Sequence, residues 1–267
     1  MHQIFREVSM HSNLGRVIEH IGRPRFWTQL TLLLQQWVPF DHALAIFYPG
    51  SGAPVVLELY DAVPHDGPAL PVYLDGLYQL DPFYQAYRDG ISSGLHRLEE
   101  VAPDQFRQSE YFLSYFHANN MLEDEEQFIV QIPGQGALSL SLGTRQPFSI
   151  EQHGILTTIC PWVLALMEHH WQEYSQPLQL TSAAETSQMR DALGQFGSSV
   201  LSEREMETAQ LILRGHSSKA IARLLAISPE TVKVHRRHLY RKLDISSQPE
   251  LFALFLQSLG HDLENHC

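Results

Sequence analysis

Lysine is scarce in this sequence: the chain holds three lysines among 267 residues, and all of them lie between positions 219 and 242. Residues 201–259 include nine Lys and Arg and six Asp and Glu, which gives this segment a net charge of +3. The whole chain carries −12, so the remainder carries −15. Most of the molecule would therefore repel a polyanion, and this one segment would accept it.

Long apolar runs and cysteines are also few. No run of eighteen apolar residues occurs, and the N-terminus, with His2, Arg6 and Glu7, lacks the apolar region of a signal peptide. The two cysteines, Cys160 and Cys267, do not make a disulfide framework. We therefore expect a soluble, cytoplasmic protein with no membrane partner.

Enzyme motifs are absent as well. The chain contains no G-x-S-x-G, no P-loop and no H-E-x-x-H sequence. Its fifteen histidines are scattered, and His169, His170 and Glu173 are better explained as an exposed polar helix face than as a metal site. We expect no enzymatic activity, no metal and no cofactor.

The basic segment has the local signals of consecutive helices. Ser202 with Glu205 three residues later predicts a capping box, and Gly215 offers a left-handed stop after the helix. A short helix follows from about Ser218, and Ser228 with Pro229 marks the start of the next one. Helix, short turn, helix is the outline of a helix-turn-helix motif.

The helix that begins at Pro229 has two different sides. At 100° per residue, Val232, Leu239 and Leu243 fall on one side. The other side carries Lys233, Val234, Arg237 and Arg241. A DNA-reading helix needs this division, because the apolar side anchors it while the basic side enters the major groove. The plainer alternative is a solvated charged face.

Four stretches of the segment carry a specific resemblance. They are Leu201-Ser-Glu-Arg-Glu205, Gly215-His-Ser-Ser-Lys-Ala-Ile-Ala222, Ile227-Ser-Pro-Glu-Thr-Val-Lys-Val-His235 and Leu239-Tyr-Arg-Lys-Leu243. Over about 60 residues the segment resembles the four-helix DNA-binding domain of LuxR-type regulators. The resemblance implies base contacts by Lys233, Val234 and Arg237, and phosphate contacts by Ser218, Lys219, Thr231 and Arg241. It also implies double-stranded DNA as a partner, with RNA polymerase as a further candidate.

The last helix bears on self-association. Residues 251–256 are six consecutive apolar residues, which on a helix cover every side. A small domain buries one of those sides, so the other is expected to meet a second copy of the chain in a homodimer. The alternative is that the helix packs against the N-terminal domain.

The chain length suits two domains: an N-terminal domain at 1–175, a polar linker at 176–200 and the helix-turn-helix domain at 201–267. In the first domain, helices are predicted at 26–38, 73–87, 110–118 and 149–174, and strands at 43–48, 55–60, 127–132 and 137–142. This order predicts an α/β fold, an α/β/α sandwich with an antiparallel sheet, followed by the all-α domain.

The N-terminal domain holds candidate ligand contacts. Leucine and serine alternate at 137–143, so Ser139 and Ser141 share one face of a strand and, if buried, need partners such as a ligand or water. The alternative is that both serines lie on a solvent-facing side of an antiparallel sheet. The helical stretches add tyrosines, and aromatic stripes are more often core than pocket. The ligand candidates are Asp81, Tyr73, Tyr84, Tyr111, Tyr115, Ser139 and Ser141.

The strands at 127–132 and 137–142 flank Gly134-Gln-Gly136, which predicts a hairpin. From Phe40-Asp-His-Ala-Leu44 to Asp81-Pro82 and this hairpin, residues 20–172 loosely resemble the autoinducer-binding domain of LuxR proteins. Asp81 matches the family's ligand-binding aspartate, but the family's upstream tryptophan and tyrosine are out of register, with Pro68 and Val72 near those places. The competing role for Asp81 is a turn cap before Pro82.

Four functions are weighed for this chain. A phospho-accepting receiver is excluded, because it needs a lysine and none precedes Lys219. We predict a one-component transcription regulator, a DNA-binding homodimer controlled by a small-molecule effector other than a typical acyl-homoserine lactone. The alternatives are a receptor for such a lactone, and a constitutive DNA binder whose N-terminal domain only dimerises.

Overall fold

A computed structural model describes residues 8–62, 69–117, 122–174 and 192–264 of the chain. The α-helices of the first half are α1 (Val8–Glu19), α2 (Phe26–Gln35), α3 (Ala69–Leu74), α4 (Pro82–Arg88), α5 (Leu98–Val101) and α7 (Ile150–Tyr174). Short turns of helix, η2 (Leu77–Leu80), η3 (Phe106–Gln108) and the π-helical η4 (Tyr111–His117), lie between them. The second half contains α9 (Ala192–Gln195), α10 (Glu203–Leu213), α11 (Ser218–Leu224), α12 (Pro229–Lys242) and α13 (Gln248–Glu264).

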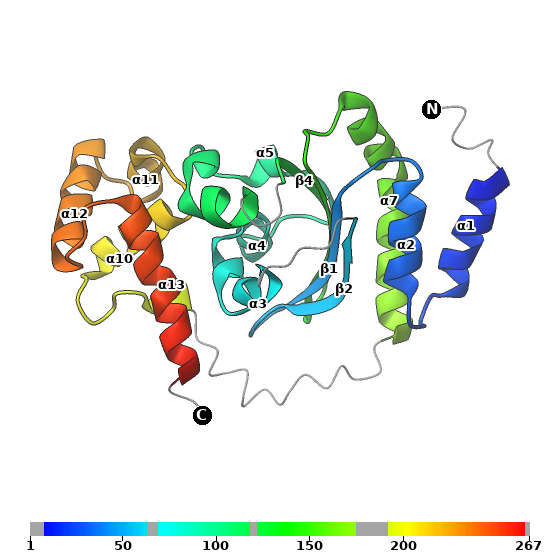
Figure 1. The fold of residues 1–267 in the computed structure, drawn as a ribbon, viewed down its shortest axis with the longest axis horizontal. Coiled ribbons are helices and arrows are strands. Elements are labelled where there is room, and N and C mark those ends of the chain that lie inside the picture. Colours follow the sequence, from blue (N-terminus) through cyan, green and yellow to red (C-terminus); the bar gives the residue numbers. More distant parts are fainter. Residues whose placement is uncertain (1–7, 63–68, 118–121, 175–191, 265–267) are drawn as a thin grey trace. The chain divides into compact units, whose positions relative to one another are not determined.

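Five strands form one antiparallel sheet in the order β2-β1-β5-β4-β3 (Figure 1). They are β1 (His42–Pro49), β2 (Val55–Asp61), β3 (Gly94–Arg97), β4 (Asp124–Ile132) and β5 (Gly136–Thr144). The hairpin between β4 and β5 turns at Gly134 and Gly136, both with positive φ, as the glycine pair in the sequence predicts. The predicted antiparallel sheet and the four predicted strands are confirmed.

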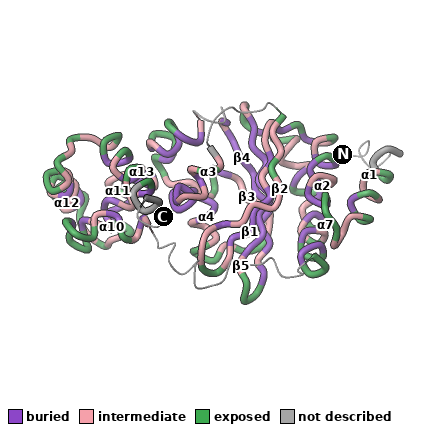
Figure 2. Tube along the Cα trace, turned by 60° about the horizontal axis from the view of Figure 1, so that its bottom comes forward, coloured by how far each residue is buried: buried purple, intermediate pink, exposed green. Residues whose placement is uncertain are grey.

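Helices α2 and α7 cover one face of the sheet, and α1 packs on α2 (Figure 1). The apolar core between these layers takes alternate residues of the central strands, among them Phe128 and Leu140, both 0% exposed. Leu30 and Leu34 of α2 and Met167 of α7 complete it from the helical side. Buried residues run the length of β1, β4 and β5 (Figure 2), so the central strands are covered rather than half-solvated.

By their contacts, the residues group into two compact units. The first unit holds the sheet with α1, α2 and α7 and comprises 1–66, 87–100 and 122–187. The second unit comprises 67–86, 101–121 and 188–267, and therefore contains the four helices α10 to α13 together with two earlier segments. The linear boundaries at 175 and 200 stay a prediction, and most of the proposed linker lies outside the described residues.

The stretch predicted as a single helix at 73–87 is broken into α3, η2 and α4. Gly76 has φ +145°, a conformation that favours glycine and ends α3. Asp81 is extended, with φ −68° and ψ 125°, because the following Pro82 disfavours a helical residue before it. The helix predicted at 110–118 is present, but its turns are π-helical at Tyr111–His117.

His170 corrects the expectation of an exposed polar face on α7. His169 and Glu173 are exposed, whereas His170 is 2% exposed and stacks on Phe26 with 4.0 Å between ring centroids. Its Nδ1 accepts a hydrogen bond from the Gly22 amide at 3.1 Å. Burial lowers the pKa of His170 to about 4, so the ring is a neutral core residue.

Candidate DNA-reading surface and ligand cluster

The predicted start and stop signals of the helix-turn-helix are present. Ser202 and Glu205 form the capping box of α10, with the Ser202 amide donating to Glu205 at 2.8 Å. Gly215 takes φ +92° in the turn before α11. Ser228 accepts from the Thr231 amide at 3.0 Å and Pro229 opens α12. Local chemistry therefore sets the ends of the two helices of the motif.

Helix α12 has the two sides predicted for it. Val232 and Leu239 are 0% exposed and anchor the helix, while Leu243 just beyond it is half-buried. The opposite side is solvent-exposed and carries Lys233, Val234, Arg237 and Arg241. This exposed side of α12 therefore presents three cations and one apolar side chain at helical spacing, which suits binding in a DNA groove.

The residues predicted for phosphate contact lie at helix starts. Ser218 and the exposed Lys219 form the first turn of α11, and Thr231 lies in the first turn of α12. Lys233 pairs with Glu230 at 2.8 Å, with both side chains well exposed, so this surface pair adds little stability and leaves the lysine available. The contacts of all these residues with DNA stay a prediction.

An ion pair that the sequence did not indicate fixes α12 to α10. Lys242 donates to Glu205 at 2.7 Å, and Glu205 is 4% exposed. Burial would raise the pKa of Glu205, but bonds from Lys242 and Ser202 outweigh it and lower the pKa to about 2. Lys242 thus ties the end of α12 to the start of α10.

The apolar residues of α13 are divided between burial and partial exposure. Leu251 and Phe255 are 0% exposed, and Phe255 packs edge-on against Phe196 at 5.6 Å between ring centroids. Leu259 lies against Gly76 of the same unit, where a Cβ would meet its Cδ2 at 2.5 Å. Leu254 and Leu256 are half-buried and lie at the two opposite edges of the buried side.

Asp81 lies in a cluster of tyrosines within the second unit. Its Oδ2 accepts from the Tyr73 hydroxyl and its Oδ1 from the Phe83 amide, both at 2.8 Å. Asp81 is 8% exposed, and burial raises its pKa although the bonds from Tyr73, Phe83 and the Tyr84 amide lower it. Asp81 therefore caps α4, as the competing prediction has it, and also holds a tyrosine hydroxyl.

The other predicted tyrosines share this cluster. Tyr115 stacks on Tyr73 at 6.3 Å and lies 5.4 Å from Tyr111, while Tyr84 meets Tyr78 edge-on at 4.8 Å. All five are 8% exposed or less. The structure thus brings Asp81, Tyr73, Tyr84, Tyr111 and Tyr115 into one aromatic cluster.

Ser139 and Ser141 belong to the sheet of the first unit, and they are 0% and 5% exposed. The solvent-facing alternative for them is therefore wrong. Ser139 donates to Gln127 at 2.5 Å, and Ser141 donates to Glu125. Gln127 in turn donates to Glu125 at 2.7 Å. The serine hydroxyls have protein partners that the sequence analysis missed, because the strand was predicted to begin only at Gln127.

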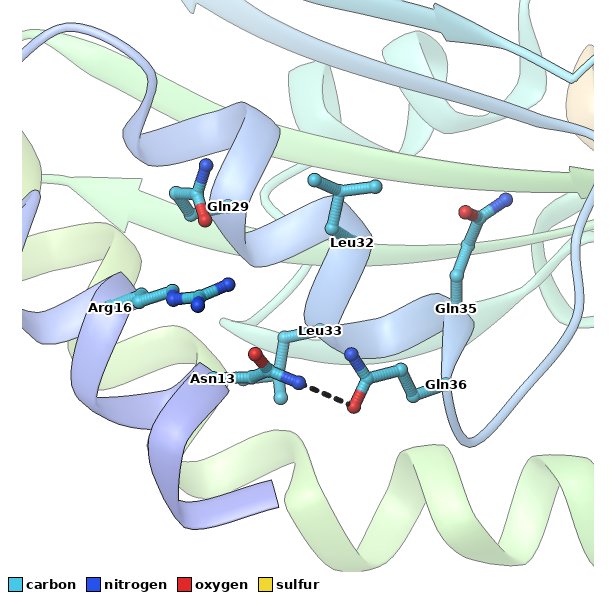
Figure 3. Close-up of a pocket in the computed structure, with 7 residues that line it drawn as sticks. All are labelled: Asn13, Arg16, Gln29, Leu32, Leu33, Gln35 and Gln36. Atoms are coloured by element: carbon cyan, nitrogen blue, oxygen red, sulfur yellow. Dashed lines mark hydrogen bonds between the residues drawn. The ribbon is translucent and has the colours of Figure 1, made fainter. Parts of the chain in front are cut away.

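A shallow hollow of about 420 Å³ lies between α1 and α2 in the first unit (Figure 3). Its lining residues are Asn13, Arg16, Gln29, Leu32, Leu33, Gln35 and Gln36. Asn13 donates to Gln36 across it at 2.9 Å. None of the predicted ligand residues lines this hollow.

No described helix has the length and apolar character needed to cross a bilayer. Among the described residues, no group of three or more His, Cys, Asp or Glu side chains is arranged to hold a metal ion.

Comparison with known proteins agrees with this geometry. Residues 199–255 match the family model described as bacterial regulatory proteins, luxR family. An HTH-type transcriptional regulator of the exeN 3′ region of Aeromonas salmonicida is 35% identical over 188 residues, which cover 67% of this chain and 94% of that protein. The nitrate/nitrite response regulator NarP of Escherichia coli is 48% identical over 62 residues, only 29% of its length.

A solved structure extends the likeness to the N-terminal half. The crystal structure of the VqsR LBD domain from Pseudomonas aeruginosa aligns with a TM-score of 0.57 and 33% identity, covering 62% of this chain and 99% of that one. The matched proteins are transcription regulators rather than enzymes. Since a relative above 30% identity is covered over nearly its whole length, the chain belongs to the LuxR family of bacterial transcription regulators.

Proposed function

We propose that the chain is a one-component regulator whose DNA binding is controlled by a small molecule bound at the aromatic cluster around Asp81. The observation that carries this proposal is a carboxylate, 8% exposed, enclosed by tyrosines in the same compact unit as the DNA-binding helices. A buried carboxylate requires a hydrogen-bond donor. Tyr73 supplies it here at 2.8 Å, and a ligand donor would take its place or share the carboxylate.

The chemistry of the cluster indicates the class of ligand. A tyrosine hydroxyl can reorient to accept a hydrogen bond, and tyrosine faces attract cations. The carboxylate of Asp81 would repel an anion. We therefore propose a neutral or cationic ligand that carries an N–H donor and an apolar part. An acyl-homoserine lactone also has these features, but the upstream tryptophan and tyrosine of the lactone-binding family are out of register in this chain, so a typical lactone is not the ligand proposed.

The test is a thermal-shift screen of the full chain against amines, amides and acyl-homoserine lactones, followed by DNA binding with each compound that stabilises the protein. Asp81→Asn keeps the cap on Phe83 but removes the charge, so it should stay folded and bind DNA without responding to the ligand. Asp89→Asn, at an exposed position, is the matched control and should respond in full. A full response by Asp81→Asn would contradict the placement of the ligand.

The same screen separates the alternative functions. Stabilisation by an acyl-homoserine lactone, with a change in DNA affinity, would identify a lactone receptor instead. If no compound that stabilises the protein alters its DNA affinity, the constitutive DNA binder is the better description.

We also propose that the regulator binds DNA as a homodimer, because helix-turn-helix proteins read paired half-sites. The half-buried Leu254 of α13 is the proposed contact. Leu251 and Phe255 are fully buried, so substitutions there would test folding rather than association. Leu254→Glu should shift the sedimentation of the full chain toward a monomer, and Gln257→Glu, at an exposed position of the same helix, should not. An unchanged dimer in Leu254→Glu would remove α13 from the interface.

A further inference from the structure

The turn before α11, the first helix of the helix-turn-helix, is hydrogen-bonded to a segment from the N-terminal half of the chain that belongs to the same compact unit. Asp104 accepts two hydrogen bonds from Ser217, one from its amide at 2.9 Å and one from its hydroxyl at 2.5 Å. One residue along, the Gln105 amide donates to the Gly215 carbonyl at 3.0 Å. Three hydrogen bonds thus join residues 104–105 to residues 215–217.

Close packing accompanies these bonds. A Cβ built on Gly215 would lie 2.9 Å from Phe106 Cα and 3.2 Å from its backbone nitrogen, so the two backbones meet where only glycine fits. Phe106 itself is 2% exposed and anchors the segment in the aromatic cluster, 6.0 Å from Tyr111. The contact is therefore a fitted surface and not a single exposed hydrogen bond.

The position of this contact matters for DNA. Ser217 caps α11, and the next two residues are Ser218 and Lys219, which are the predicted phosphate contacts. The first helix of a helix-turn-helix crosses the DNA backbone. An exposed carboxylate bonded at the start of that helix places negative charge beside a polyanion that carries one charge per about 1.7 Å.

We propose that residues 103–106 form an intramolecular clamp that holds back DNA binding, with Asp104 as the group that both ties down the helix-turn-helix and repels the phosphates. Binding to DNA then requires the clamp to open, so the free energy of the closed contact is subtracted from the affinity. The clamp needs no ligand, so it can be tested independently of the proposed ligand. If that proposed function holds, the contact between Phe106 and Tyr111 gives a bound ligand a route to open it.

The experiment compares full-length Asp104→Ala and Asp89→Ala with the unaltered chain. Both variants raise the net charge by one, but Asp89 lies outside the clamp, in the first unit. Binding to a 30-base-pair duplex of random sequence is measured by fluorescence anisotropy at two salt concentrations. Asp104→Ala should bind about five times more tightly, the effect of removing one contact-distance repulsion in water. Asp89→Ala should change the affinity by less than about twofold.

The sign of the effect distinguishes the clamp from a purely structural role. If Asp104 only stabilised the start of α11, its removal would loosen the motif and weaken DNA binding. Asp104→Asn provides a second test, because its amide oxygen can still accept from the Ser217 amide while the charge is gone. The gain in DNA affinity of Asp104→Asn should be smaller than the gain of Asp104→Ala. Equal affinities for Asp104→Ala and Asp89→Ala, or a loss in Asp104→Ala, would overturn the proposal.

Discussion

Acid should destabilise the first unit through His170. The ring is buried, stacks on Phe26 and accepts from the Gly22 amide on Nδ1. Protonation of Nδ1 would remove that acceptor and place a charge in an apolar site, which agrees with a pKa lowered from 6.5 to about 4. In the unfolded chain the ring takes up its proton at the higher pH. The unfolded state therefore binds more protons between pH 6.5 and 4, and stability falls as the pH is lowered through this range.

The size of this effect follows from the two pKa values. The contribution of His170 to the free energy of unfolding is fully present well above pH 6.5. It has fallen by about 2 kcal/mol at pH 5 and by about 3 kcal/mol at pH 4. Urea unfolding followed by tryptophan fluorescence can measure it. All four tryptophans lie at positions 27, 37, 162 and 171, within the first unit, so the signal reports on that unit alone.

His170→Phe removes the titrating group and can keep the stack on Phe26. The variant leaves the Gly22 amide without its acceptor, which lowers stability by about 1–3 kcal/mol at every pH. This loss cancels when the stability of one variant is compared at two pH values. Between pH 7.5 and pH 5.0, the unaltered chain should lose about 2 kcal/mol more than this variant. His169→Gln, at the exposed neighbouring position, should lose as much as the unaltered chain. An equal loss in His170→Phe and the unaltered chain would refute the reasoning.

Further predictions concern the second unit. Arg237→Ala should cost about 1–3 kcal/mol on an operator selected from random sequences and relax its sequence preference. Equal weakening on selected and random duplexes, measured by anisotropy, would show that Arg237 contacts phosphate instead. Lys219→Ala should weaken binding to all sequences alike and reduce the salt slope by about one, as a salt titration would show. Glu205→Ala should destabilise the DNA-binding helices by about 1–2 kcal/mol, because it removes the capping box and the bond to Lys242. A calorimetric melt without any downward shift would contradict that role.

The sequence predicts the DNA-binding helices closely because their signals are local. Ser202, Gly215 and Ser228 act on amides or backbone angles within a few residues of themselves. The two sides of α12 follow in the same way from helical spacing alone. For this part of the chain, the pattern of residues suffices to predict which side of α12 is buried and which is exposed.

The N-terminal half is harder to predict because its decisive partners are distant in sequence. Acidic residues are unfavourable in strands, so 124–126 do not look like the start of β4. Glu126 is nevertheless 0% exposed, because His153 lies 3.0 Å from its carboxylate and Arg97 lies 4.0 Å away. His170 and Gly22 are likewise 148 positions apart. No local pattern indicates such pairs.

The buried polar residues of the sheet bear on whether the N-terminal half only dimerises. Glu125, Gln127, Ser139 and Ser141 are all 7% exposed or less, and they satisfy one another by hydrogen bonds. Such networks add little net stability, since the desolvation of a buried carboxylate is as large as the bonds that compensate it. Apolar residues of similar size would fill the same strands at least as stably. A sheet that served only to hold two copies together has no need of this network.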